Sequence, residues 1–151
     1  MTMSERLPVE FVANPSSDIV DAIADGLNRF NGAKGGDDNY QPFALVIRNE
    51  AGEIVGGLNA ATFFGWLAIE LLWVDDAFRG QGYGSELLRQ AEAIGRERGC
   101  ERAYLNTMSF QAPAFYESFG YVEFARLPND ARGFKRHYFQ KTLLPTSNSP
   151  K

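Results

Sequence analysis

The spacing of apolar residues along the chain predicts three helices. Ile19, Ile23 and Leu27 recur every four residues, so they lie on one face of a helix. A second apolar stripe ends just before Gly99, a residue type that commonly follows the last turn of a helix. The expected helices cover residues 17–30, 85–98 and 112–119.

Runs of β-branched and aromatic residues between turn-forming residues predict strands. Around Gly52, two such runs are separated by a short polar turn, which indicates an antiparallel hairpin. The alternation of strands and helices is typical of a mixed sheet flanked by helices, in the α+β or α/β class. The expected strands lie at residues 9–13, 43–48, 54–62, 66–74, 102–107, 121–127 and 134–142.

Composition and charge narrow the class of protein. With 151 residues, of which 44% are hydrophobic, the chain suits one domain at residues 1–144, followed by a disordered polar tail at 145–151. A net charge of -4 argues against a nucleic-acid partner, which usually binds a basic surface. The single cysteine and the absence of any run of about 18 apolar residues favour a cytoplasmic protein without a membrane partner. No group of His, Cys and carboxylates has metal-ligand spacing, so we expect no metal.

The main chemical signal is a glycine-rich loop at residues 75–84, between an apolar strand and an amphipathic helix. Gly80, Gly82 and Gly84 allow the backbone to approach a ligand closely. The first turn of the following helix offers unpaired N–H groups and the positive end of the helix dipole. Arg79 adds a cation that can pair with a phosphate oxygen. The segment therefore predicts a phosphate or diphosphate site.

Two common phosphate-binding motifs fit this loop poorly. A P-loop needs Lys and then Ser or Thr after its last glycine, whereas Ser85 and Glu86 follow Gly84. The dinucleotide motif needs glycines at its first, third and sixth places. Gly80 and Gly82 supply two of them, but Ser85 stands at the third.

A different pattern does match. Arg79, Gly82 and Gly84 form Arg-x-x-Gly-x-Gly, and residues 111–121 contain a short helix with Tyr116, followed by a glycine and an aromatic residue. On these motifs the sequence resembles the GNAT superfamily of N-acetyltransferases. The resemblance implies an α+β GNAT fold, with a mostly antiparallel central sheet of about six to seven strands between helices. It also implies that the fourth and fifth expected strands splay apart, so that the pantetheine arm of acetyl-CoA pairs with free backbone groups in the gap.

The resemblance implies a set of binding residues and a place for the acceptor. The acceptor site would be built from residues 27–41 and 127–139. The resemblance also implies that a second copy of the chain could be a partner in a homodimer. The residues implied to bind acetyl-CoA are Leu72, Trp73, Val74, Arg79, Gly80, Gln81, Gly82, Tyr83, Gly84, Ser85, Ser109, Ala112 and Phe115. Ser109 departs from the family pattern, because many relatives carry Asn there, which puts its side-chain role in doubt.

Two residues are implied to be catalytic. Tyr116 resembles the family's general acid, which protonates the CoA thiolate; the alternative is a packed aromatic residue. Glu70 lies in an otherwise apolar strand and is the candidate base. If Glu70 is buried, its pKa should be raised; the alternative is an edge residue or a partner of a buried arginine. His137 and Cys100 are interpreted as an exposed strand residue and a buried inert thiol.

The sequence therefore favours an enzyme that transfers acetyl from acetyl-CoA to a primary amine of a small molecule by direct attack in a ternary complex. Two alternatives stay open: an acetyltransferase for protein lysines or N-termini, and a non-catalytic acyl-CoA sensor. Loops carry specificity, so the sequence alone leaves the acceptor undefined.

Overall fold

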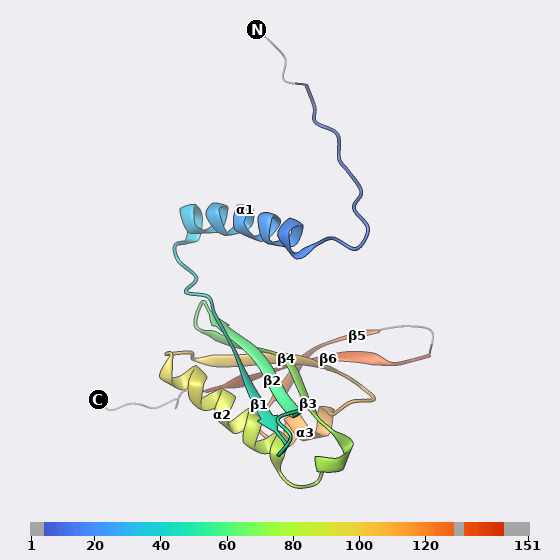
Figure 1. Cartoon of the computed structure of the whole chain (residues 1–151). Coiled ribbons are helices and arrows are strands. Elements are labelled where there is room, and N and C mark those ends of the chain that lie inside the picture. Colours follow the sequence, from blue (N-terminus) through green and yellow to red (C-terminus); the bar gives the residue numbers. More distant parts are fainter. Residues whose placement is uncertain (1–4, 129–131, 144–151) are drawn as a thin grey trace, which may run out of the picture. The chain divides into compact units, whose positions relative to one another are not determined.

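The computed structural model describes residues 5–128 and 132–143, so the predicted tail at 145–151 lies outside the described residues (Figure 1). The chain divides into two compact units, Met1–Asp38 and Asn39–Lys151. That they act as one domain stays a prediction. Among the described residues, no helix combines the length and apolarity that a membrane crossing requires.

The first unit contains one helix, α1 (Ser17–Gly35), and corrects the sequence prediction in two places. The strand expected at residues 9–13 is wrong, because these residues are irregular and Phe11 is 89% exposed. Strand-forming side chains without a pairing partner do not make a strand. The helix expected at residues 17–30 continues to Gly35, and it ends at Gly36, which has a positive φ of 83°.

The second unit is built on a six-stranded sheet with the strand order β1-β2-β3-β4-β6-β5. Every neighbouring pair is antiparallel except β3 and β4, which run parallel. The mixed, mostly antiparallel sheet is therefore confirmed. The strands are β1 (Gln41–Arg48), β2 (Ile54–Phe63), β3 (Trp66–Val74), β4 (Arg102–Met108), β5 (Val122–Pro128) and β6 (Lys135–Thr142).

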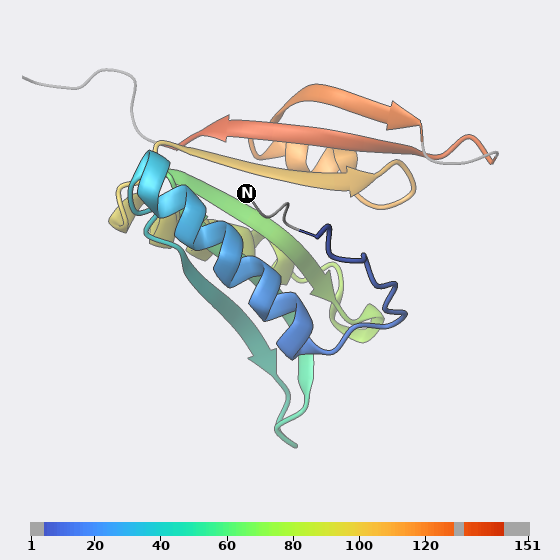
Figure 2. The same cartoon turned by 90° about the horizontal axis from the view of Figure 1, so that it is seen from above.

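Strands β3 and β4 separate along their length, as the resemblance implied. They pair only where Trp66–Ala68 of β3 meets Arg102–Tyr104 of β4, and beyond these residues the two ribbons diverge (Figure 2). On the other side of β3, the register with β2 shifts at Asn59 and Ala60, so that Glu70 is the extra residue of a β-bulge. The sheet thus opens at its centre and bulges beside the opening, which is a common arrangement near functional sites.

Two helices, α2 (Tyr83–Glu97) and α3 (Pro113–Ser118), pack on one face of the sheet (Figure 1). Leu88 of α2, Leu105 of β4 and Phe139 of β6 are almost fully buried in the shared core. A buried carboxylate also ties α2 to the sheet. Glu92 accepts hydrogen bonds from the Tyr121 hydroxyl at 2.9 Å and from Lys141 Nζ at 2.8 Å.

Candidate functional site

The glycine-rich loop brings the end of β3 to the start of α2. A single 3-10 turn, η1 (Asp76–Phe78), follows β3, and Gly80 and Gly82 then adopt positive φ angles of 77° and 86°. Such angles favour glycine over every other residue. Gly82 is the N-cap of α2, and no side chain caps the helix there. The first-turn N–H groups of α2 are therefore open to a ligand, as a diphosphate site requires.

A pocket of about 680 Å³ lies against this loop. It falls in the size range of ligand and cofactor sites, and its walls come from β3, the loop, α2 and α3. A Cβ added at Gly80 or at Gly82 would meet no heavy atom within 4 Å, so the space beside these two residues is open. The pocket is lined by Leu72, Trp73, Val74, Phe78, Arg79, Gly80, Gly82, Tyr83, Gly84, Ser85, Phe110, Gln111, Ala112, Phe115 and Tyr116.

The structure therefore brings together most of the residues that the sequence assigned to acetyl-CoA. Gln81 and Ser109 are the two that do not line the pocket. Ser109 instead bonds to the start of β6, because its Oγ accepts a hydrogen bond from the Lys135 backbone at 3.1 Å. Sequence reasoning did not assign Gln111, although it lies within the second motif. Its Oε1 accepts from the Met108 backbone N–H at 2.6 Å and so fixes the approach to α3.

Arg79 is held at the mouth of the pocket rather than left free. Its Nε donates to the Val74 carbonyl at 3.0 Å, and its Nη1 lies 2.6 Å from Asp76 Oδ1. The Arg79 side chain is 62% exposed, so this ion pair adds little to stability. The two contacts orient the side chain, and a phosphate could compete with Asp76 for the guanidinium.

Tyr116 is the most strongly perturbed titratable group that lines the pocket. It is 7% exposed and packs beside Phe115, Tyr121 and Phe139. Burial raises the pKa of Tyr116 to about 12, so the phenol holds its proton at neutral pH. No described residue forms a hydrogen bond with the Tyr116 hydroxyl. Every fully buried polar side-chain atom among the described residues does have a partner, so the unpaired hydroxyl of Tyr116 is not fully buried. The hydroxyl oxygen is therefore accessible from the pocket.

A second pocket, of about 300 Å³, adjoins the first at the gap between β3 and β4. The two share Leu72, Ala112, Gln111 and Tyr116 as lining residues. The smaller pocket adds polar groups that the larger one lacks, which come from three strands. They are Glu70 of β3, Asn106 and Thr107 of β4, and Arg136 of β6.

Glu70 lies at this second pocket, but it is not buried. Its carboxylate is exposed, and its Oε2 accepts a hydrogen bond from Asn59 Nδ2 at 3.0 Å. The sequence analysis expected a raised pKa for Glu70 only if this residue is buried, and the structure does not meet that condition. The negative charge of Glu70 nevertheless acts on Tyr104 of the neighbouring strand β4. The pKa of Tyr104 is raised mainly by burial, and the charge of Glu70 is the second cause. A water-exposed carboxylate beside the gap can accept a proton directly or through water.

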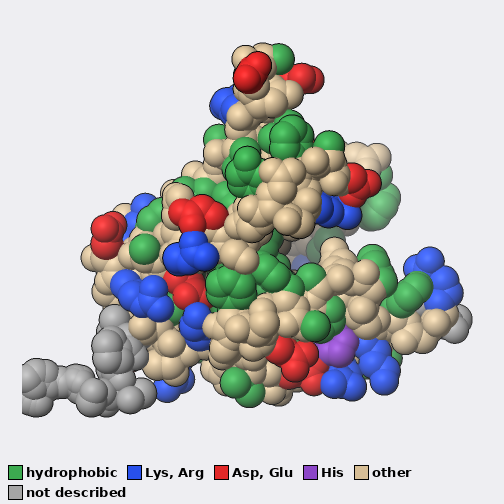
Figure 3. Space-filling model, turned by 90° about the horizontal axis from the view of Figure 1, so that it is seen from below, with side chains coloured by type: hydrophobic (Ala, Val, Ile, Leu, Met, Phe, Trp, Pro, Cys, Tyr) green, Lys and Arg blue, Asp and Glu red, His purple; other side chains and the backbone are tan. Residues whose placement is uncertain are grey.

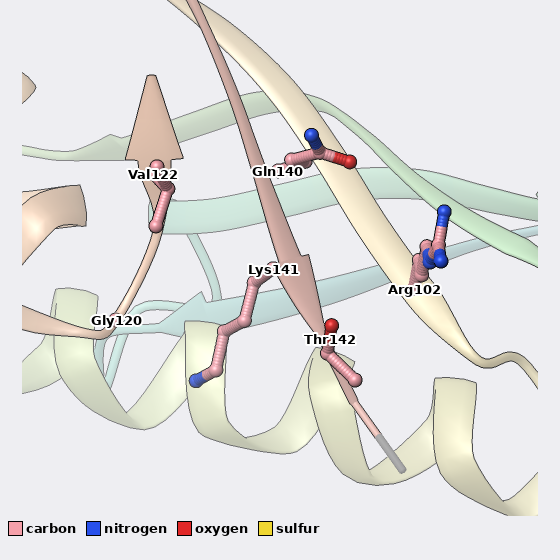
Figure 4. A pocket seen from close by; sticks show the side chains of 6 residues that line it. All are labelled: Arg102, Gly120, Val122, Gln140, Lys141 and Thr142. Atoms are coloured by element: carbon pink, nitrogen blue, oxygen red, sulfur yellow. The ribbon is translucent and has the colours of Figure 1, made fainter. Parts of the chain in front are cut away.

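A third pocket, of about 490 Å³, lies at the opposite end of β4 and β6 (Figure 4). It is lined by Arg102, Gly120, Val122, Gln140, Lys141 and Thr142. Figure 4 shows Lys141 extending toward α2, where its Nζ is neutralised by Glu92 at 2.8 Å. None of the residues predicted to bind acetyl-CoA lines this pocket.

The remaining candidate residues have structural partners. His137 is only 12% exposed, which corrects the expectation of an exposed residue, and its Nδ1 contacts the Glu123 carboxylate. Figure 3 shows the one histidine (purple) with acidic and basic side chains beside it. Cys100 is buried as expected, and burial raises the pKa of its thiol. Within residues 5–128 and 132–143, no three His, Cys, Asp or Glu side chains gather as metal ligands.

Comparisons with known proteins identify the family of this chain. Residues 17–121 match the model of the Acetyltransferase (GNAT) family. The chain is 39% identical over 116 residues to the acetyltransferase Atu2258 of Agrobacterium fabrum, covering 74% of this chain and 85% of the relative. It is 41% identical over 102 residues to the blasticidin-S acetyltransferase of Streptomyces morookaense, covering 67% and 75%. A proposed acetyltransferase from Agrobacterium tumefaciens has a crystal structure that superposes with a TM-score of 0.82 at 33% identity, covering 91% and 99%.

Proposed function

Because this chain belongs to the GNAT acetyltransferase family, we propose that it transfers the acetyl group of acetyl-CoA to a primary amine of a small molecule. The observation that carries the proposal is the open, glycine-capped start of α2 at the edge of the larger pocket. This cradle suits a diphosphate, and the adjoining gap between β3 and β4 leads from it to the exposed carboxylate of Glu70.

Donor binding would use backbone groups more than side chains. The open N–H groups at residues 82–85 would hold the diphosphate, with Arg79 beside it. The pantetheine arm would then lie along the unpaired edge of β3 beyond Ala68, as an added strand would. This places the thioester at the gap, where the two pockets adjoin and Tyr116 lines both.

The chemistry is a direct displacement at the thioester carbon. The neutral amine nitrogen forms a bond to the carbonyl carbon, and the carbon–sulfur bond breaks. The ammonium proton leaves to Glu70, directly or through water, because a primary ammonium with a pKa near 10 must be deprotonated before attack. Tyr116 donates its phenol proton to the departing thiolate. Backbone N–H groups of Leu72–Val74 that face the gap would stabilise the oxyanion.

A small-molecule acceptor is favoured over a protein one by the relative from Streptomyces morookaense, which is described as a blasticidin-S acetyltransferase. That description belongs to the relative. We expect the acceptor to bind on the face of the sheet away from the core, where Glu70 and Asn106 border the smaller pocket.

A thiol-release assay with acetyl-CoA over a panel of small primary amines tests the proposal. We expect stoichiometric CoA and acetylated amine with some members of the panel, and none with boiled protein. Binding of CoA without release for any small amine would favour an acyl-CoA sensor. Release with lysine peptides or free peptide N-termini alone would favour a protein acetyltransferase. Absence of CoA binding would refute the proposal.

A further inference from the structure

Arg136 of β6 places a positive charge on the acceptor side of the gap, and the proposed reaction gives this charge no role. Met108 of β4 pairs with Arg136 of β6, and Asn106 pairs with Tyr138, so these side chains share one face of the sheet. Tyr104 lies on the same face, two residues before Asn106, and it pairs with Ala68 of β3. Glu70 comes two residues after Ala68 and therefore lies on this face as well. The opposite face carries Leu105 and the core. Glu70 and Arg136 therefore stand on the same face, on opposite sides of the gap.

Arg136 is oriented but not neutralised. Its Nη1 donates to Asn106 Oδ1, which fixes the guanidinium beside the smaller pocket. Within the described part of the chain, no carboxylate lies within 4.0 Å of it. Arg79 and Arg126, by contrast, each lie 2.6 Å from a carboxylate oxygen. A guanidinium has five N–H donors, so Arg136 keeps donors available for a ligand.

Glu70 is likewise without a basic partner in the described residues, since its carboxylate accepts from the neutral amide of Asn59. The pocket therefore has a negative wall on β3 and a positive wall on β6, with no ion pair joining them. A simple cationic amine would be attracted by Glu70 and repelled by Arg136. A molecule with both an amine and an anionic group would be attracted by both walls.

We propose that the acceptor is an amino acid-like molecule whose carboxylate binds Arg136 while its amine lies beside Glu70. This inference rests on the proposed function and narrows its substrate class. A carboxylate matches the planar fork of the guanidinium with two parallel hydrogen bonds, which fixes orientation as well as affinity. Held at both ends, the amine nitrogen is aimed at the thioester in the gap.

The expected kinetic signature follows from the placement of Arg136 on β6, whereas the candidate base Glu70 lies on β3. Arg136 is not on the strand that carries Glu70, and its contact with the acceptor is the same before and during attack. Such a contact changes KM more than kcat. Hydrogen bonds to charged groups contribute enough that losing one should lower kcat/KM by about tenfold or more.

The test uses amines in matched pairs. Each amino carboxylate, such as lysine, β-alanine and 4-aminobutyrate, is compared with its primary carboxamide, and 3-aminopropylphosphonate serves as a second anionic probe. We expect kcat/KM for the better carboxylates to exceed that for their carboxamides by about tenfold or more, mainly through KM. Activity with the phosphonate would show that the site accepts anions in general, which also supports the proposal.

Arg136→Gln should reduce the carboxylate preference to about one, and Arg136→Lys should retain part of it, because a point charge replaces the fork. Lys135→Gln is the matched control, because it removes a positive charge at the neighbouring, exposed position of β6. It should keep the preference of the wild type.

Two results would overturn the inference while leaving the proposed function intact. One is equal kcat/KM for carboxylates and carboxamides in the wild-type enzyme, which needs no variant to be folded. The other is a carboxylate preference that survives in folded Arg136→Gln. Failure of every amine to release CoA would instead refute the proposed function, and this inference with it.

Discussion

Replacing Gly82 by alanine separates the ligand-binding role of the loop from its backbone strain. Gly82 precedes α2 with a φ of 86°, and Gly99 follows the same helix with a φ of 79°. A Cβ added at either position would have no heavy atom within 4 Å. Gly82→Ala and Gly99→Ala therefore impose the same kind of strain, of about 1 kcal/mol, at the two ends of one helix.

The two variants should lose stability to a similar extent and differ in CoA binding. For a chain of this length, each kcal/mol lowers Tm by about 2–4 °C. Only Gly82→Ala puts a methyl group and a strained backbone at the proposed diphosphate site. Loss of one hydrogen bond to a charged group, about 1.5–3 kcal/mol, would raise the Kd for CoA by about 10- to 150-fold.

Differential scanning calorimetry and isothermal titration with CoA measure both quantities on the same samples. We expect matched losses of Tm in the two variants and a raised Kd for CoA in Gly82→Ala alone. If Gly82→Ala binds CoA as tightly as Gly99→Ala and the wild type, the loop does not hold the diphosphate. If both variants bind CoA weakly to the same extent, the effect reports strain in α2 and not contact with the ligand.

Other residues give further predictions. Tyr116→Phe should lower kcat by about 100-fold or more with little change in the Kd for CoA, and unchanged turnover in a thiol-release assay would remove the phenol from the mechanism. Because the folded pKa of Tyr116 is about 12, above the unfolded value near 10, the wild type should lose stability between pH 10 and 12. Denaturant unfolding of Tyr116→Phe should show a smaller loss over that range, and equal losses would contradict the raised pKa. Glu70→Gln should flatten the acidic limb of the pH–rate profile, whereas an unchanged limb would make solvent the proton acceptor. Glu92→Ala should lower Tm by about 5–15 °C because it leaves Lys141 partly buried without its carboxylate, and an unchanged Tm would show that Glu92 is not a structural link.

Local patterns in the sequence predicted the elements whose partners lie close along the chain. The meander of β1, β2 and β3 follows from adjacent runs, and α2 follows from its apolar stripe and terminal glycines. The strand expected at residues 9–13 had the right residues but no partner, and pairing is decided by the rest of the fold. The start of α2 was misplaced by two residues, because Gly82 in a left-handed conformation serves as its cap.

The candidate site was predicted only where it is contiguous in sequence. The loop and the Tyr116 helix each carry a motif, so their residues were found, and they line one pocket in the structure. Arg136 was not found, because it meets Asn106 across 30 residues through the pairing of β4 and β6. The exposure of Glu70 was also unpredictable, since it depends on a bulge that apolar neighbours in the sequence do not reveal.

A crystal structure of the protein with CoA bound tests the central claim most directly. We expect diphosphate oxygens within hydrogen-bond distance of backbone N–H groups at residues 82–85, with the thiol at the gap between β3 and β4 near the Tyr116 hydroxyl. A diphosphate bound instead in the pocket of Arg102 and Lys141 at the far end of β4 would contradict it.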